Sequence, residues 1–168
     1  GTPAWQLAHG LNAWPDDQRL RKTTPDAFLR TDMEARLRAL GVDELVVCGM
    51  HSEFCVDTTT RRALALGFPV TLVADGHTSA GNAALAAPQI VAHHNATLTN
   101  ISSFGPRARA VPAQVLEFNT GLQGGGVGGR GGADGDAVLR LAGGRGAGSG
   151  EGAHARKAAI WLARRRTG

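Results

Sequence analysis

The sequence is poor in the features that mark secreted and membrane proteins. It has only two cysteines, Cys48 and Cys55, so it offers no disulfide framework, and a reducing cytoplasm is the expected compartment. No stretch approaches the roughly 18–20 apolar residues that a membrane-spanning helix requires, and no signal peptide is recognisable. We therefore expect a cytoplasmic protein with no membrane partner.

Glycine and net positive charge are scarce in residues 1–118 and concentrated in residues 119–168. The first part holds eight of the 24 glycines, with ten Lys and Arg against eleven Asp and Glu; the second holds sixteen glycines, with eight basic residues against three acidic ones. The net charge of +4 thus arises in the second part, which argues against nucleic acid as a partner. We predict one folded domain over 1–118 and a Gly/Arg-rich low-complexity tail over 119–168, which is disordered over 119–152 and has a short basic helix as an option at 154–166.

Apolar periodicity predicts alternating helices and strands in residues 1–118. Between Thr31 and Gly41 apolar residues recur at helical spacing, Thr31 with Glu34 forms a candidate capping box, and Gly41 suits the left-handed residue that ends a helix. Apolar runs predict strands over 18–22, 44–48, 69–74 and 97–101, and further helices are expected over 55–66 and 83–95. This order is typical of an α/β fold with an open parallel sheet and helices on both faces.

Cys55 stands where a predicted buried strand breaks into a helix. The apolar run stops at Gly49, a polar turn follows, and a helical pattern opens at Cys55. The first turn of a helix stabilises a thiolate, and ligands of open α/β sheets bind at the carboxyl ends of strands. A cysteine is otherwise most often a small buried hydrophobe, which fits Cys48 inside the strand. Position alone leaves both interpretations open for Cys55.

The residues around Cys55 resemble the signature of the isochorismatase-like cysteine hydrolases. The stretch is GMHSEFCVDTTTRRALALGFPVTLVADG, in which a Gly ends a strand and a Ser stands three residues before Cys-Val and a Thr-rich helix start. The upstream stretch RKTTPDAFLRTDMEARLRALGV and the downstream stretch IVAHHNATL are also similar to that superfamily. It includes nicotinamidases, N-carbamoylsarcosine amidases, streptothricin hydrolases and isochorismatase. The resemblance extends over roughly residues 3–118.

The resemblance implies a Rossmann-like layered fold and hydrolysis of a small amide through a thioester acyl-enzyme. It assigns Cys55 as the nucleophile and Lys22 as the ammonium that stabilises its thiolate. The backbone N–H groups of His51 and Cys55 would form the oxyanion hole, and the Met50–His51 peptide bond would be cis. A small-molecule amide is the expected partner, together with a homo-oligomeric full-length form. No cofactor is expected, and no metal ligand is assigned, because the Asp-x-His loop of the nicotinamidase branch would lie before Gly1.

One member of the implied site has no counterpart in the sequence. The family's general base is an Asp that follows an apolar strand in an Asp-x-Gln context, whereas the only acids before Lys22 are Asp16 and Asp17 in a loop-like context. We therefore expect the first two strands of the fold to be missing and the chain to be the C-terminal portion of a hydrolase. Loss of a general base commonly costs about 10²–10⁴ in rate. The alternative function is accordingly a catalytically inactive fragment or remnant of such an enzyme.

Other polar residues have simpler interpretations. His93 and His94 are adjacent on a predicted helix and point about 100° apart, so a packing pair is favoured over a metal site. Asp75 ends a strand and is expected to have a structural role. Glu53 and Asp57 are expected to face solvent. A redox or metal pair of the two cysteines is disfavoured, because their spacing is unlike C-x-x-C.

Overall fold

The computed structural model describes residues 17–116, 136–142 and 157–162 of the chain. Its strands are β1 (Gln18–Arg21), β2 (Glu44–Met50), β3 (Val70–Thr78), β4 (Ala108–Val111), β5 (Asp136–Ala142) and β6 (Lys157–Leu162). Its α-helices are α1 (Met33–Ala39), α2 (Asp57–Ala65) and α3 (Ala87–Asn100), with a π-helix η2 (Ser52–Val56) and a 3-10 helix η3 (Ala113–Val115). Helices and parallel strands alternate along most of this region, which confirms the predicted α/β class.

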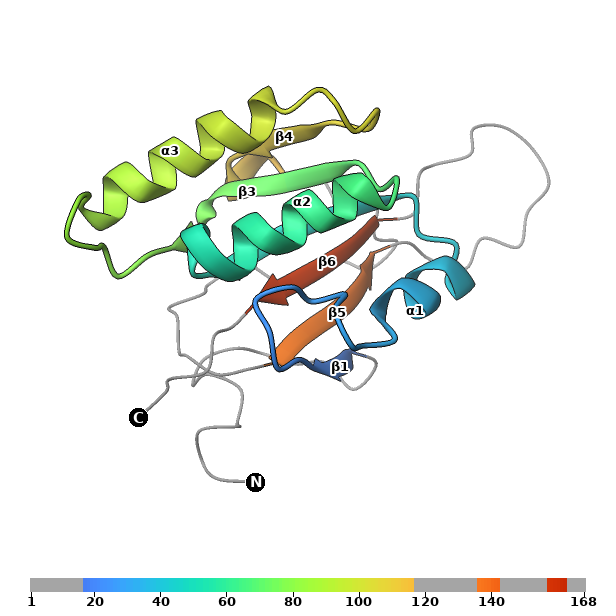
Figure 1. The fold of residues 1–168 in the computed structure, drawn as a ribbon. Coiled ribbons are helices and arrows are strands. Elements are labelled where there is room, and N and C mark those ends of the chain that lie inside the picture. The colour runs from blue at the N-terminus through green and yellow to red at the C-terminus, as the bar shows by residue number, and fades with distance from the viewer. Residues whose placement is uncertain (1–16, 117–135, 143–156, 163–168) are drawn as a thin grey trace.

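The strands form a single sheet in the order β1-β5-β6-β2-β3-β4 (Figure 1). β6, β2, β3 and β4 are parallel to one another, whereas β5 is antiparallel to both of its neighbours. Because two reversals across β5 restore the original direction, β1 runs the same way as β2. The carboxyl ends of β1, β2 and β3 therefore lie on the same side of the sheet, which we call its carboxyl edge. The candidate site lies there.

Two of the strands lie in the predicted Gly/Arg-rich tail. β5 occupies 136–142, so the prediction of disorder is wrong for this range, and β6 occupies 157–162, where a short basic helix was the option that the sequence offered. Pairing with β2 explains why residues of the tail form a strand. Without β6, one side of β2 would leave its backbone N–H and C=O groups without hydrogen-bond partners. β6 pairs with β2 from Glu44 to Gly49. The other residues of the predicted tail, and residues 1–16 and 117–118 of the predicted domain, lie outside the described residues.

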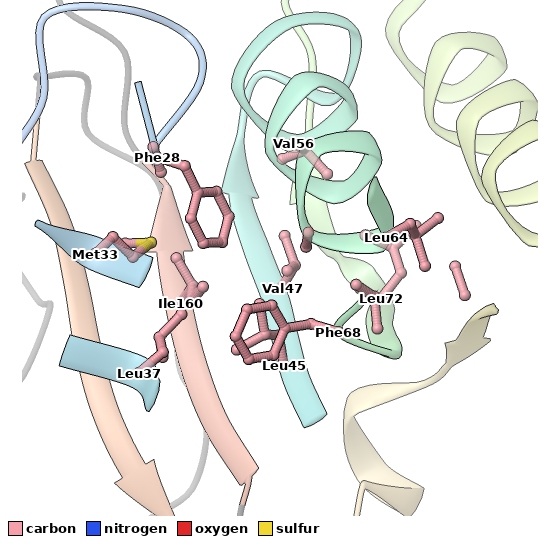
Figure 2. Packing of buried hydrophobic residues seen from close by; sticks show 14 of the residues in the cluster. Phe28, Met33, Leu37, Leu45, Val47, Val56, Leu64, Phe68, Leu72 and Ile160 are labelled. Carbon is pink, nitrogen blue, oxygen red and sulfur yellow. The ribbon is translucent and has the colours of Figure 1, made fainter. Parts of the chain in front are cut away.

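The main hydrophobic core lies between one face of the sheet and the α-helices (Figure 2). Its largest fully buried side chains are Met33, Leu37, Leu45, Val47, Val56, Leu64, Leu72, Leu98 and Ile160. These residues come from α1, η2, α2 and α3 on one side and from β2, β3 and β6 on the other. Side chains along β2 alternate in direction, so Leu45 and Val47 enter this core while Val46 and Cys48 point to the opposite face.

The opposite face of the sheet has a smaller apolar cluster. Val46, Cys48 and Val73 form it, and Ala113 and Leu116 pack against them. The Asp75 carboxylate accepts the Ala113 N–H at 2.7 Å, which agrees with the structural role predicted for Asp75. Within the described ranges this face is covered by η3 rather than by an α-helix, so the expected helical layer is much thinner here than on the first face.

The ends of α1 show which capping predictions hold. The helix begins at Met33, and Thr31 Oγ1 donates to the Ala27 carbonyl at 2.7 Å while it accepts the Met33 N–H at 3.3 Å. The predicted capping box of Thr31 with Glu34 is therefore wrong. Gly41 follows the helix with φ of 62°, the left-handed conformation predicted for it.

α3 lies further along the chain than the helix predicted over 83–95. It starts at Ala87 and continues to Asn100, so the predicted start is four residues too early and the strand predicted over 97–101 is wrong. Leu98 is fully buried in the main core, and packing there favours continuation of the helix over the local strand pattern. No helix in the part of the chain that the structure describes combines the length and the apolar character needed to cross a membrane.

Candidate active site

β2 ends in a bend that brings the following turn to the carboxyl edge of the sheet. Gly49 has φ of 118°, a backbone conformation that favours glycine. The Met50–His51 peptide bond is cis, at the position that the family resemblance implies. The π-helix η2 follows at once, and the His51 carbonyl accepts two backbone N–H groups from it, at 3.1 and 3.2 Å. Cys55 lies within η2, two residues before the first residue of α2.

The side chains of Cys55 and Lys22 are in contact, and both residues are buried. Lys22 Nζ donates to Cys55 Sγ at 3.3 Å and to the Thr24 carbonyl at 3.2 Å. The exposed fraction is 1% for Cys55 and 4% for Lys22. An ammonium group withdrawn from water needs a compensating partner, and a thiolate would supply the opposite charge. The positive end of the α2 dipole is a second feature that stabilises an anion at this position.

Lys22 reaches Cys55 because of the direction of β1. Lys22 follows the last residue of β1, and β1 runs the same way as β2, whose carboxyl end leads into η2. Both side chains consequently lie at the same edge of the sheet although they are 33 positions apart in the chain. The resemblance assigned Lys22 to the site, and the structure brings it to the sulfur.

Cys48 has a different environment seven positions away in the same strand–turn unit. It is 3% exposed, and its Sγ donates a weak hydrogen bond to the Ile160 carbonyl at 3.6 Å. Burial raises the pKa of Cys48 far above the ordinary value for a thiol. Neither cysteine forms a disulfide. Cys48 is therefore a core thiol, as predicted from its place in the apolar strand.

Glu53 does not face solvent, contrary to the expectation from sequence. Its side chain is 14% exposed, and its Oε1 accepts the Ser79 hydroxyl at 2.8 Å and lies 3.9 Å from His51 Nδ1. Its other oxygen, Oε2, is buried with no hydrogen-bond partner among the described residues. The expectation assumed a polar turn, whereas the residues fold as a π-helix and direct Glu53 toward the end of β3. Asp57 is also only partly exposed and pairs with Arg61 at 2.9 Å.

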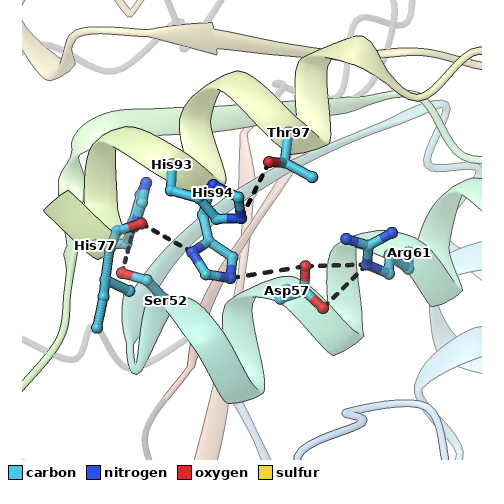
Figure 3. A network of polar contacts seen from close by, with 8 residues as sticks. Ser52, Asp57, Arg61, His77, His93, His94 and Thr97 are labelled. Atoms are coloured by element: carbon cyan, nitrogen blue, oxygen red, sulfur yellow. Dashed lines mark hydrogen bonds and ion pairs between the residues drawn. The ribbon is translucent and has the colours of Figure 1, made fainter. Parts of the chain in front are cut away.

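A buried chain of hydrogen bonds lies beside the turn and was missed by sequence reasoning (Figure 3). Ser52 Oγ lies 2.7 Å from His77 Nδ1, and His77 Nε2 lies 3.0 Å from Asn95 Oδ1. Asn95 Nδ2 in turn donates to the Ala74 carbonyl at 2.9 Å. Ser52 is fully buried and His77 is 5% exposed. A histidine two residues after Asp75 in an otherwise apolar strand was the sequence signal that could have identified this chain.

The two adjacent histidines of α3 do not converge on one point. His94 Nδ1 donates to the Ile90 carbonyl at 2.8 Å, and His93 Nε2 lies 3.3 Å from Thr97 Oγ1. Their rings meet edge to face with centroids 5.2 Å apart. Across residues 17–116 and the two C-terminal strands, no group of three or more His, Cys, Asp or Glu side chains is arranged to hold a metal ion.

Comparison with known proteins places this geometry in a family. The model of the isochorismatase domain matches residues 1–106. The chain belongs to the isochorismatase family. A streptothricin hydrolase of Streptomyces noursei is 46% identical over 76 residues, which cover 45% of this chain and 28% of the relative. The ureidoacrylate amidohydrolase RutB of Caulobacter vibrioides is 32% identical over 100 residues, which cover 60% of this chain and 41% of the relative.

A solved structure supports the same assignment. An isochorismatase from Pseudomonas putida is 30% identical and superimposes with a TM-score of 0.61, over 67% of this chain and 57% of its own. This family member shares the α/β fold described above. The chain thus matches between about a quarter and three fifths of the length of these three relatives.

Proposed function

We propose that Cys55 is the nucleophile of a hydrolase that cleaves the C–N bond of a small amide. The observation that carries the proposal is the 3.3 Å contact between the buried Lys22 Nζ and Cys55 Sγ at the carboxyl edge of the sheet. Support comes from the names of two family members, a streptothricin hydrolase and an ureidoacrylate amidohydrolase. An amide is the substrate class that a sulfur nucleophile of this kind would attack.

The proposed acylation step makes one bond and breaks one. The Cys55 sulfur donates an electron pair to the amide carbonyl carbon, and the carbonyl oxygen becomes an oxyanion. Collapse of this tetrahedral species breaks the C–N bond, and the leaving nitrogen takes up a proton from water, which replaces the proton that the thiol released to solvent when it ionised. The product is an amine or ammonia and a thioester on Cys55. Lys22 keeps the sulfur anionic before attack.

The oxyanion requires hydrogen-bond donors fixed in advance. The backbone N–H groups of His51 and Cys55 lie on the turn between β2 and α2, and they are the donors that the family resemblance assigns. Preorganised donors of this kind commonly contribute about 10²–10³ to the rate. Because backbone groups are held by the turn, their placement depends on how firmly η2 is fixed.

Hydrolysis of the thioester requires water and a base, and no residue of this chain is assigned that role. The Asp-x-Gln base of the family has no match in the sequence; of the two candidate acids, Asp16 lies outside the described residues. We therefore propose that this chain becomes acylated on Cys55 and releases the acyl group slowly. No cofactor enters either step.

Acyl-enzyme trapping tests the proposal. The chain is incubated with a p-nitrophenyl ester as activated acyl donor and with a panel of small primary amides, and intact-mass spectrometry measures bound acyl groups. We expect one acyl group per chain on Cys55, retained in Cys48→Ala and absent in Cys55→Ala. No adduct with any donor would favour the inactive remnant. Turnover that survives Cys55→Ala would contradict the role of this sulfur.

A further inference from the structure

The hydrogen-bond chain beside η2 has a defined direction. The Asn95 side chain donates from Nδ2 to the Ala74 carbonyl, so its Oδ1 faces His77 and accepts. His77 Nε2 must then carry a hydrogen. In the neutral imidazole Nδ1 is consequently the acceptor, and the Ser52 hydroxyl donates to it. The order of donation is Ser52 to His77 to Asn95 to Ala74.

From this geometry we infer that His77, as the neutral Nε2–H tautomer, is a positioning residue that fixes Ser52 and with it the turn that carries Cys55. The inference deepens the proposed function and rests on it for the role of the Cys55 sulfur. His77 acts through Ser52, which is the first residue of η2.

The position of Ser52 explains why its anchor matters. Ser52 lies between His51 and Cys55, the two residues whose backbone N–H groups are proposed as oxyanion donors. Its fully buried hydroxyl is tied to β3 through His77 and to α3 through Asn95. On the other side of the turn, Lys22 holds the Cys55 sulfur. The turn is thus fixed at two points, one through a side-chain cation and one through a neutral imidazole.

Protonation of His77 would reverse one link of the chain. The imidazolium carries hydrogens on both nitrogens, so Nδ1 donates to Ser52 Oγ and the Ser52 hydroxyl hydrogen must turn to another acceptor. Ser52 is fully buried, so such a rearrangement strains the start of η2.

The surroundings of His77 keep it neutral. Burial lowers the pKa of His77, and His94 on α3 lowers it further, whereas the hydrogen bond to Asn95 and the charge of Asp75 on β3 oppose the shift. On η2, the third element packed around it, the titratable residues are Glu53 and Cys55. Glu53 is engaged by the Ser79 hydroxyl rather than by His77.

Two measurements on the full chain test the inference. Ring ¹⁵N chemical shifts report the tautomer and titration of His77, and the backbone amide shifts of residues 52–56 report the turn. The rate of Cys55 alkylation by iodoacetamide is followed over the same pH range. The variants are Asn95→Asp, which places a carboxylate at Nε2, and His77→Gln, which removes the titration. His93→Gln on the exposed side of α3 is the matched control.

We expect the Nε2–H tautomer, with the turn amides shifting as His77 is protonated. Alkylation should fall by about threefold to tenfold more than thiol protonation alone explains, the range that one hydrogen bond supports. Two quantities should change with the protonation of His77: the amide shifts of the turn and the excess fall in the alkylation rate of Cys55. Asn95→Asp should move both changes to higher pH together, His77→Gln should abolish them, and His93→Gln should alter neither. An Nδ1–H tautomer, or turn amides that ignore the His77 titration, would overturn the inference. If the amides follow His77 but Cys55 forms no acyl adduct, the proposed function fails and the positioning of the turn stands.

Discussion

Cys48 and Cys55 are equally buried, yet their surroundings differ in charge. Cys48 lies in β2 and its thiol donates to the Ile160 carbonyl, an acceptor that offers no hydrogen to stabilise an anion. Cys55 lies in η2, and an ammonium group is 3.3 Å from its sulfur. Their exposed fractions are 3% and 1%, so exposure does not distinguish them. The proposed nucleophile therefore differs from the core thiol in its charged neighbour and not in its access to solvent.

The two cysteines also show how the middle of β2 differs from the turn that follows it. The middle of β2 is paired on both sides, by β3 and β6, and a thiol there only fills space. Beyond Met50 the backbone leaves the sheet, and the turn contacts the side chains of Lys22, which follows β1, and of His77 in β3. The proposed nucleophile therefore lies among the few residues that follow the end of the strand.

The largest expected effect concerns the core thiol. Ile160→Ala removes a fully buried side chain from β6, and we expect the free energy of unfolding to fall by about 2–5 kcal/mol. Since each 1.4 kcal/mol is about a factor of ten, Cys48 should become labelled at least about 25-fold faster, because its labelling requires opening of the sheet. Denaturant titration and mass-resolved labelling measure both quantities.

The exposed residue Val115 provides the control for this substitution. Val115→Ala should change the free energy of unfolding by no more than about 0.5 kcal/mol, since that side chain is 58% exposed. Equal effects of Ile160→Ala and Val115→Ala would mean that β6 does not contribute to the core of the folded chain.

The next effect concerns the charged partner of Cys55. Lys22→Met keeps an apolar stem and removes the ammonium, so alkylation of Cys55 by iodoacetamide at neutral pH should slow by about 10- to 1000-fold. Lys22→Arg keeps a positive charge and should lose less. Labelling of Cys48 should be the same in all three proteins. An alkylation rate of Cys55 that is unchanged in Lys22→Met would contradict the proposal that the Lys22 ammonium activates this sulfur.

The smallest effect is the pH dependence of stability that arises at His77. Its pKa in the folded chain is lowered by burial, so the unfolded chain binds more protons between that value and the ordinary value of about 6.5. The free energy of unfolding should therefore fall as the pH falls through this interval, by at most about 1.4 kcal/mol per pH unit, and this group should have no effect above it.

Chemical denaturation of the wild type and His77→Gln at a series of pH values measures this contribution. The difference between the two proteins should be constant above the interval and should shrink as the wild type loses stability within it. A difference that grows on acidification would mean that the folded chain favours the charged imidazole.

The sequence was sufficient for local features and insufficient for those that depend on the sheet. The strand predicted over 44–48 and the left-handed Gly41 follow from short patterns, and the structure confirms both, although the strand continues to Met50. The contact of Lys22 with Cys55 depends on the direction of β1, which is set by β5 in a glycine-rich region that the composition marked as disordered. No local pattern contains that information.

The hydrogen-bond chain was missed for a related reason. Sequence reasoning considered His93 and His94 together because they are adjacent, whereas the side chain that matters beside them is Asn95. Its partner His77 is 18 positions away on a different element, and only the packing of α3 against β3 brings the two together. Adjacent residues on a helix point in different directions, so proximity in sequence selected the wrong pair.

The most direct test of the central claim is the ultraviolet absorbance of the thiolate in single-cysteine proteins. Cys48→Ala retains only Cys55, and Cys55→Ala retains only Cys48, so each protein reports one sulfur without the need for a reagent to reach it. We expect a thiolate signal at neutral pH in Cys48→Ala that disappears when Lys22→Met is added, and no signal in Cys55→Ala below the pH at which the chain unfolds. Equal absorbance in the two single-cysteine proteins, or a Cys55 signal that is indifferent to Lys22, would contradict that claim.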